Sequence, residues 1–210
     1  MNRYPDYKRA VRLAYRTLLH LKVDKLPIDI VSICRQCKNT IIISYSKAEP
    51  FATMLGLNLV NDAPSEMAFT YRIEPVEGPV VHLLLYNDEP YQNAARLRFT
   101  LAHELGHIVL KHKGSSYIEE AEANCFAQHL LCPEPLVKSL QEISVNECIL
   151  AATFGVSIST ARIVLSEKNR SSIIDPQYVE MLHHMFQILK YGPGVLIQGV
   201  FENLVSAKGL

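Results

Sequence analysis

Two histidines, His103 and His107, lie four residues apart, and a glutamate, Glu104, directly follows the first. At 3.6 residues per turn of a helix, the two imidazoles stand about 40° apart on one face and can share one metal ion. Glu104 lies about 100° from His103, near enough to act as general base on a metal-bound water without ligating. The stretch from about Asn93 to His112 is predicted to be helical by its apolar spacing, at Leu97, Leu101, Leu105, Ile108 and Val109.

A metal site on this helix needs a further ligand, because a catalytic zinc takes three protein ligands and leaves one position for water. The next predicted helix, about Ile118 to Leu131, begins with three glutamates, Glu119, Glu120 and Glu122. Glu120 is centred on a face of small and apolar residues, where a charge is costly unless it is paired or metal-bound. We therefore predict Glu120 as the third ligand, with Glu119 as the reserve. A solvated first turn, favoured by the helix dipole, accounts for Glu119 and Glu122.

Two further polar side chains lie close to these residues in the sequence. His112 falls about 140° around the helix from His107, and the helix is predicted to stop at Gly114 after a basic last turn. We therefore expect His112 at a solvated helix end and not as a ligand. Asn124 lies one turn beyond Glu120 on the same face, where its side-chain amide would accept the second N–H of a ligating histidine.

The segments around these two helices indicate how the site is held. Apolar residues at helical spacing predict helices over most of residues 93–190. Residues 46–65 contain two prolines and a glycine and are predicted to be irregular, with room for a short element between them. Strands early and helices late predict an α+β domain, with a small antiparallel or mixed sheet packed on the helix of His103 and on further helices. The predicted early elements are helices over 1–21 and from Leu26, and strands over 40–45, 68–73 and 80–86, the last two forming a hairpin.

Composition bounds the class of protein. The 210-residue chain is 49% hydrophobic and carries 21 acidic against 21 basic side chains. Such a chain folds as a globular domain, and its neutrality argues against general binding to DNA or to anionic membranes. No apolar run reaches the ~18 residues of a membrane span, and the amphipathic N-terminus does not have the pattern of a secretory signal. We therefore expect a cytoplasmic protein with no membrane partner.

Five cysteines fit reduced thiols used as small core residues. Cys34 and Cys37 form a Cys-x-x-Cys pair of the kind found in zinc and redox sites. A structural zinc site needs a second matched pair, which Cys125 and Cys132 do not supply. We therefore predict that the cysteines are structural.

The metal-binding residues belong to a longer pattern. The segment Arg-Phe-Thr-Leu-Ala-His-Glu-Leu-Gly-His (98–107) is followed by Glu-Ala-Glu-Ala-Asn-Cys-Phe-Ala (120–127) and by Leu-Leu-Cys-Pro (130–133). This combination resembles the ImmA/IrrE-type metallo-endopeptidases, and the resemblance covers roughly residues 20–165. Cys132 stands where that family more often has methionine, an apolar exchange without mechanistic consequence.

The resemblance implies a zincin-like fold in which Zn²⁺ is held by His103, His107 and Glu120, with Glu104 as the catalytic residue. It further implies a zinc-dependent endopeptidase that hydrolyses a peptide bond in a specific protein. The implied substrate is a helix-turn-helix transcriptional repressor of a phage, a mobile element or a stress response. A non-proteolytic zinc module with a regulatory or binding role is the alternative, although a structural site needs no base beside its ligands.

We expect residues 1–170 to form the metallopeptidase domain and residues 171–210 a C-terminal helical extension of unknown role. Within the domain, residues 144–167 look like a helix-turn-helix. Their few basic side chains are offset by acidic ones, and Ile158, Ile163 and Val164 suggest burial. We therefore expect structural helices here and no nucleic-acid partner.

Two features of the substrate site stay open at the level of sequence. The strand over 80–86 is either an edge on which an extended substrate pairs or an ordinary sheet strand. A group that stabilises the oxyanion is also expected, and the candidates by proximity in sequence are Tyr71, His82, Tyr86 and Tyr117.

Overall fold

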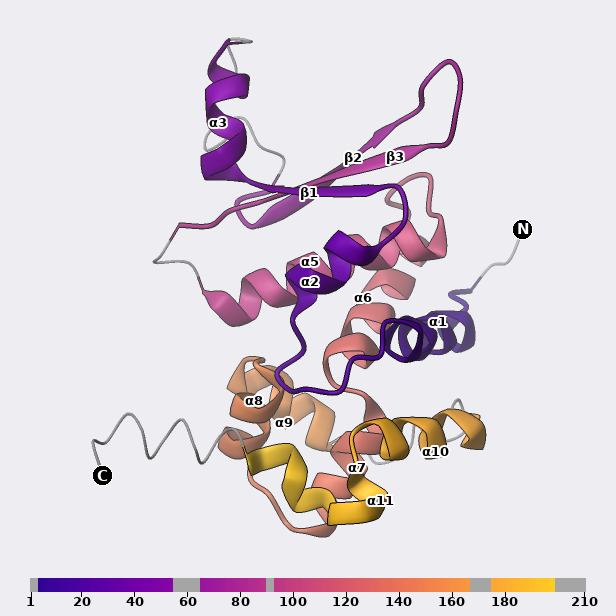
Figure 1. Cartoon of the computed structure of the whole chain (residues 1–210), viewed down its shortest axis with the longest axis vertical. Helices are drawn as coiled ribbons and strands as arrows, with labels where there is room; N and C mark the ends of the chain where they lie inside the picture. Colours follow the sequence, from indigo (N-terminus) through magenta and orange to yellow (C-terminus); the bar gives the residue numbers. More distant parts are fainter. Residues whose placement is uncertain (1–3, 55–64, 90–92, 167–174, 199–210) are drawn as a thin grey trace.

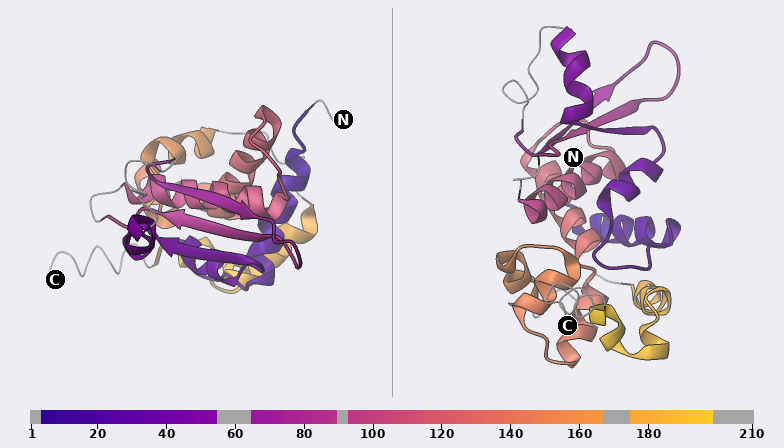
Figure 2. Two further views of the ribbon diagram at one scale, coloured as in Figure 1. Left: turned by 90° about the horizontal axis from the view of Figure 1, so that it is seen from above. Right: turned by 60° about the vertical axis from the view of Figure 1, so that its left-hand side comes forward.

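The computed structural model describes residues 4–54, 65–89, 93–166 and 175–198. A three-stranded sheet covers two central helices, and shorter helices complete the side away from the sheet (Figures 1 and 2). The predicted α+β class, with the small sheet early in the chain, is confirmed. The central helices are α5 (Ala94–Leu110) and α6 (Tyr117–Leu131), and the strands are β1 (Thr40–Ser44), β2 (Ala68–Ile73) and β3 (Val81–Tyr86).

The sheet is mixed, with β3 in the centre. β3 pairs in parallel with β1 and antiparallel with β2, so the predicted hairpin is confirmed. The interpretation of residues 80–86 as an exposed edge is wrong, because both backbone edges of β3 are occupied by neighbouring strands. Among the described strands β2 pairs only with β3, and it packs against α5. The sheet edge beside α5 therefore belongs to β2.

Two early helices flank the central pair. α1 (Tyr7–His20) packs on α6, and the Asp6 side chain caps it by accepting the N–H of Arg9. α2 (Ile30–Gln36) is capped by Asp29 in the same way and packs on β1 and α5. Both helices fall within the segments predicted from the sequence.

One continuous core joins the sheet to the helices. Leu84 of β3 is fully buried on the inner face of the sheet, together with Leu105 of α5 and Phe126 of α6. The same cluster contains Leu182 and Leu196, which come from the helical segments after residue 175. Those later segments therefore share their apolar packing with the rest of the described chain.

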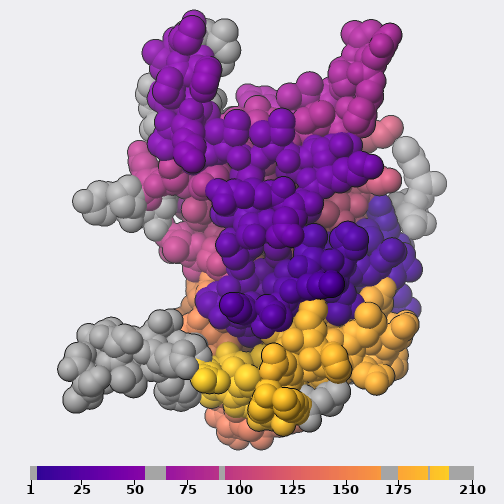
Figure 3. All heavy atoms as spheres, in the orientation of Figure 1, coloured from indigo at the N-terminus to yellow at the C-terminus, as the bar shows by residue number. Residues whose placement is uncertain are grey.

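Residues 45–54 form a helix, α3 (Tyr45–Met54), in a segment that was predicted to be irregular with room for a short element. Pro50 removes one backbone donor from the helix interior. At the first turn the Asp88 carboxylate accepts from the N–H of Ser46 at 3.1 Å and from its hydroxyl, which caps the start of the helix. Figure 3 shows α3 and the β2–β3 hairpin projecting from the sheet at opposite corners. The remainder of the predicted irregular segment, 55–64, lies outside the described residues.

The helix α5 ends at Leu110, before the predicted stop at Gly114. Lys111 adopts a left-handed conformation with φ 58°, and its N–H bonds to a carbonyl of the last helical turn. The N–H of His112 reaches the carbonyl of His107 at 3.0 Å. This is the Schellman arrangement that ends many helices, with lysine in the place usually taken by glycine. Beyond Leu110 the chain therefore leaves the helical path.

Shorter helices follow α6. Arg98 of α5 donates hydrogen bonds to the carbonyls of Gly155 (2.9 Å) and Phe154 (3.3 Å). These bonds attach the turn between α8 (Glu147–Phe154) and α9 (Ile158–Ser166) to the central helix. Within the described ranges no single helix is long and apolar enough to cross a membrane, and only the bent pair α8 and α9 passes that test when combined. The helices are α7 (Glu134–Glu142), α8 (Glu147–Phe154), α9 (Ile158–Ser166), α10 (Pro176–Met185), α11 (Ile188–Tyr191) and the 3-10 helix η2 (Pro193–Ile197).

The helix-turn-helix-like segment is the pair α8 and α9. Ile158 and Ile163 are 48% and 55% exposed, so the burial expected for them is wrong, whereas the burial expected for Val164 is confirmed. α9 instead buries Ala161 and Val164, which lie on its opposite face. The guanidinium of Arg162 is engaged by Glu147 at 2.7 Å.

Candidate metal centre

Three donor atoms from two helices converge at one point. His103 and His107 lie on successive turns of α5, and Glu120 lies in the first turn of α6. The Nε2 atoms of the two histidines are 3.0 Å apart. The carboxylate of Glu120 lies 3.2 Å from Nε2 of His103 and 3.5 Å from Nε2 of His107. In the described part of the chain, these residues form the one group of histidine, cysteine or acidic side chains whose donors suit a metal ion.

The donor set and its spacing fit a tetrahedral ion. Ligand atoms bonded to zinc at ~2.0–2.1 Å lie about 3.3 Å from one another. Two imidazoles and a glutamate are also a ligand set found in catalytic zinc sites. Burial, followed by the nearby His103, lowers the pKa of His107 to about 4, so its ring is neutral at pH 7, as a metal ligand must be. These three side chains can hold a metal ion.

The first turn of α6 is set by a capping box, which places Glu120. The Ser116 hydroxyl accepts the N–H of Glu119 at 3.3 Å, and the Glu119 carboxylate accepts the N–H of Ser116 at 3.0 Å. Glu119 also accepts from the backbone N–H groups of Lys113 and Gly114. These bonds, led by the one from Ser116, lower the pKa of Glu119 to about 2. Because the Glu119 carboxylate already accepts hydrogen bonds from the backbone at the start of α6, the geometry favours Glu120 at the metal position.

The side chain of Asn124 lies beside the other ring nitrogen of a predicted ligand. Its Oδ1 atom is 2.9 Å from Nδ1 of His103. An amide oxygen accepts hydrogen bonds, so this contact suits a His103 ring that carries its proton on Nδ1 and directs Nε2 at a metal.

Glu104 opens on the same cavity as the three donors. The cavity has a volume of about 380 Å³ and is bounded by α5, by the turn after it and by the inner face of the sheet. Burial raises the pKa of the Glu104 carboxyl, an effect that the neighbouring Thr70 and His103 side chains partly oppose. The lining residues are Thr70, Arg72, His82, His103, Glu104, His107, Ile108, His112, Lys113, Gly114, Ser115 and Glu120.

This arrangement corresponds to a known family. A family model described as the IrrE N-terminal-like domain of the M78 peptidases matches residues 62–166. The chain belongs to this family. The matched segment carries His103, Glu104, His107 and Glu120 and extends to the end of α9. The chain matches no curated protein at a significant level.

Two residues of this M78 domain lie elsewhere than the sequence predicted. His112 was expected at a solvated helix end, but its side chain is 5% exposed and its ring contacts His107. Glu122 was assigned to a solvated first turn, but it is buried and bonded to His112 at 3.0 Å. The error arises at Lys111, whose left-handed conformation ends the helix and turns the His112 ring back toward His107. The helical wheel assumed an unbroken helix at that point.

The four oxyanion candidates are separated by their positions in the M78 domain. Only His82, on the inner face of β3, lines the cavity with the metal donors. Tyr71 packs edge-on against Phe69 on the outer side of the sheet. Tyr117 is 83% exposed, and Tyr86 packs against the main core. The sequence offered no signal for choosing among them, because the inward or outward position of each side chain follows from strand register.

Proposed function

We propose that this M78 domain is a zinc-dependent endopeptidase. The observation that carries the proposal is the convergence of His103, His107 and Glu120 beside Glu104 in one cavity. Zinc is proposed because two imidazoles and one carboxylate suit it in tetrahedral geometry. A purely structural site would need no carboxylate base next to its ligands, so Glu104 favours catalysis.

The protein side chains have distinct roles in the proposed reaction. A bound zinc supplies Lewis acidity, which lowers the pKa of a coordinated water toward ~7 and polarises the scissile carbonyl. Glu104 accepts the proton of the attacking water and later donates it to the leaving amine. The burial that raises the pKa of Glu104 makes it a stronger base than a solvated glutamate. Asn124 orients the His103 ring through Nδ1.

The substrate is proposed to bind as an extended segment along β2. This strand borders the cavity through Thr70 and Arg72, and among the described strands its second edge has no partner. Backbone hydrogen bonds to such an edge hold a peptide without regard to most of its side chains. Binding of this kind places a scissile bond over the metal donors.

We further propose that the substrate is a specific protein of the cytoplasm, a helix-turn-helix transcriptional repressor. The support is the likeness of the sequence to ImmA/IrrE-type peptidases and the family match. Where the sheet borders the cavity, the described lining side chains are polar or charged, namely Thr70, Arg72 and His82, which suits recognition of a polar segment of the substrate.

The test compares new protein N-termini, across the proteome, in cells that express this chain and in cells that express Glu104→Gln. The substitution keeps the size of the side chain and leaves the three metal ligands in place while it removes the base. A Glu142→Gln variant, altered at an exposed position of α7, is the matched control. We expect cuts that occur with the native chain and the control but not with Glu104→Gln, and a slowing of about 10²–10⁴-fold for the purified variant on the identified substrate.

The identity of the cut protein tests the second part of the proposal. Cleavage of a helix-turn-helix repressor would support it. Cleavage of a protein of another class would show that the proposed substrate class is wrong. Identical N-termini in the native host, with zinc bound to both proteins at equal stoichiometry, would favour a non-proteolytic regulatory zinc module instead.

A further inference from the structure

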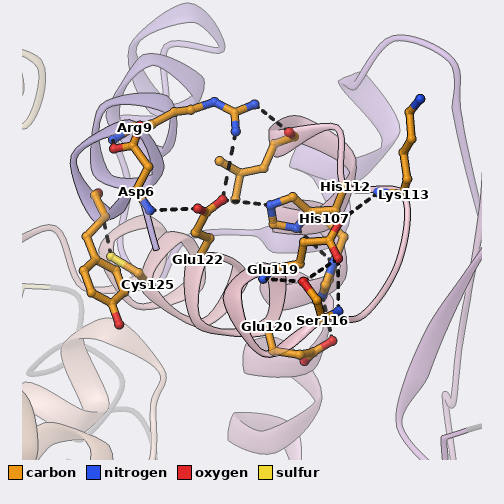
Figure 4. A network of polar contacts seen from close by, with 12 residues as sticks. Asp6, Arg9, His107, His112, Lys113, Ser116, Glu119, Glu120, Glu122 and Cys125 are labelled. Carbon is orange, nitrogen blue, oxygen red and sulfur yellow. Dashed lines mark hydrogen bonds and ion pairs between the residues drawn. The ribbon is translucent and has the colours of Figure 1, made fainter. Parts of the chain in front are cut away.

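His107 is connected to the first turn of α1 by a buried chain of polar groups (Figure 4). Nδ1 of His107 lies 3.1 Å from Nδ1 of His112, and Nε2 of His112 lies 3.0 Å from Oε2 of Glu122. The other oxygen of Glu122 accepts the backbone N–H of Asp6 at 2.7 Å. We propose that Glu122 and His112 are positioning residues, which fix the tautomer and the orientation of His107 as a metal ligand.

The acceptor at the end of the chain determines the direction of both hydrogen bonds. A carboxylate only accepts, so the Glu122 contact requires the His112 proton on Nε2. Nδ1 of His112 is then an acceptor and receives a hydrogen bond from the N–H that His107 carries on Nδ1. The unprotonated Nε2 of His107 is left facing His103 and Glu120, as a metal ligand requires. The opposite tautomer of His107 would put a proton where the metal binds.

The two positioning side chains are almost completely removed from water. His112 is 5% exposed and Glu122 is 9% exposed at their side chains. Polar groups in such positions are costly unless they are hydrogen-bonded, and here each has a partner at both ends. Breaking one contact would leave its neighbour buried with an unmet hydrogen bond, so the chain favours one arrangement of the His107 ring.

The anchor of the chain comes from a distant part of the sequence. Asp6 and Glu122 are separated by 116 residues, and Arg9 of α1 lies 4.0 Å from the Glu122 carboxylate. Arg9 also donates to the carbonyl of Leu110, the last residue of α5, at 2.6 Å. The start of α1 therefore holds both Glu122 and the end of the helix that carries His107. No residue of α1 lines the metal cavity itself.

The two histidine ligands are supported unequally. His103 has one outer partner, Asn124, on an exposed position of α6. His107 is supported by two buried side chains and, through them, by the packing of α1 on α6. We therefore expect substitutions at His112 and Glu122 to weaken metal binding, although neither residue touches the metal.

This inference rests on the proposed zinc ligation, and the first measurement keeps the two apart. Zinc affinity of the full chain is measured by competition with a chromophoric chelator, with Glu120→Gln as a variant that removes a ligand. If the native chain does not bind one zinc, or if Glu120→Gln binds as well as the native chain, the metal site itself is wrong. If both behave as expected, the positioning role is tested by the variants below.

His112→Phe keeps a ring of similar size without an acceptor, and His112→Asn restores an acceptor at the place of Nδ1. We expect the zinc dissociation constant to rise about 10–100-fold in His112→Phe and in Glu122→Gln, and to rise less in His112→Asn. Glu142→Gln, remote from the site, should match the native chain. Zinc affinities of His112→Phe and Glu122→Gln within about threefold of native, or equal losses in the Phe and Asn variants, would overturn the proposal.

A measurement on the native chain tests the same proposal and does not depend on whether the substituted proteins fold. Nitrogen-15 NMR of the zinc-loaded protein, labelled at histidine, reports which ring nitrogen carries the proton. We expect the proton of His107 on Nδ1 and that of His112 on Nε2. A His112 proton on Nδ1, or zinc bound through Nδ1 of His107, would contradict the proposed chain directly.

Discussion

Gly106 of α5 lies directly against Ala123 of α6. A Cβ atom at position 106 would stand 3.2 Å from both the Cα and the carbonyl oxygen of Ala123. Because these are backbone atoms, relief requires a movement of α6 as a whole. The same two helices carry the three side chains that could hold a metal ion, His103 and His107 on one and Glu120 on the other. The distance between the helices therefore sets the distance between the donors.

Gly106→Ala should weaken both the fold and the metal site. Alanine gains up to ~1 kcal/mol of helix propensity, but the forced separation costs about 1–3 kcal/mol, so we expect a net loss near 1 kcal/mol. Zinc affinity should fall because Glu120 moves away from the histidines. Thermal unfolding of the metal-free protein and zinc competition measure the two effects. Gly194→Ala is the control, since a Cβ there meets no atom within 4 Å. A Gly106→Ala protein with higher stability and native zinc affinity would contradict the role of this contact.

Glu120 and Glu119, adjacent in sequence, should respond oppositely to substitution. Glu120→Ala removes a ligand and should abolish stoichiometric zinc binding at micromolar concentrations. Glu119→Ala removes the reciprocal cap of α6 and should cost about 1 kcal/mol of stability while zinc still binds. Metal content by mass spectrometry and thermal unfolding separate the two outcomes. If Glu119→Ala lost zinc while Glu120→Ala kept it, the third ligand would be Glu119 and not Glu120.

The stability that Glu119 contributes should depend on pH. Its pKa in the folded protein is about 2, below the ordinary ~4.3 of a glutamate. The depressed folded value means that the contribution is present above pH ~4.3 and is lost as the pH falls toward 2. Glu119 is partly exposed, so solvent screening keeps the effect small. In metal-free protein, Glu119→Gln should lower the melting temperature at pH 6 and match the native chain near pH 2. A difference that grows on acidification would refute this sign.

Lys111→Gly should stabilise the protein. Lys111 has φ 58°, a conformation that costs a side-chain-bearing residue about 1–2 kcal/mol relative to its favoured regions. Part of the gain is lost through the greater freedom of glycine in the unfolded chain, so we expect about 0.5–1 kcal/mol, or roughly 1–4 °C in melting temperature. Lys113→Gly, at a neighbouring exposed position without positive φ, should be neutral or destabilising. An equal response of the two variants would mean that the left-handed turn is not populated.

The cysteines should differ in reactivity according to burial. None of the five forms a disulfide, and Cys148 is exposed. Burial raises the pKa of Cys132 to about 12 and that of Cys37 to about 11, and a protonated thiol is a poor nucleophile. At pH 8 a limiting amount of alkylating agent should therefore label Cys148 first in the folded protein. Peptide mapping by mass spectrometry gives the order, and labelling of Cys132 at the rate of Cys148 would contradict the described burial.

The sequence predicted the parts of the molecule that depend on local periodicity. His103 and His107 could be placed on one helix face because the spacing of apolar residues established the helix itself. Glu120 could be placed near the two histidines because its position among small residues implied a close helix neighbour, and Gly106 of that neighbouring helix lies against Ala123. The hairpin of β2 and β3 followed from alternating strands around a loop rich in proline and glycine.

The remainder depends on contacts between distant segments, which periodicity does not contain. The position of β3 in the middle of the sheet is decided by its parallel pairing with β1, about forty residues earlier in the chain. The burial of Glu122 depends on Asp6 and His112. A lysine in the left-handed region leaves no mark in the sequence, since glycine or asparagine is the residue that normally signals such a turn.

The outer edge of β2, which has no partner among the described strands, has a consequence for the behaviour of the protein at high concentration. An unpaired row of backbone N–H and C=O groups accepts a strand from any source, including a second copy of the same chain. The charged end of β2, where Arg72 pairs with Glu74, is of the kind that discourages such self-association. Substitutions that neutralise this pair should therefore lower solubility, and a peptide that occupies the edge should restore it.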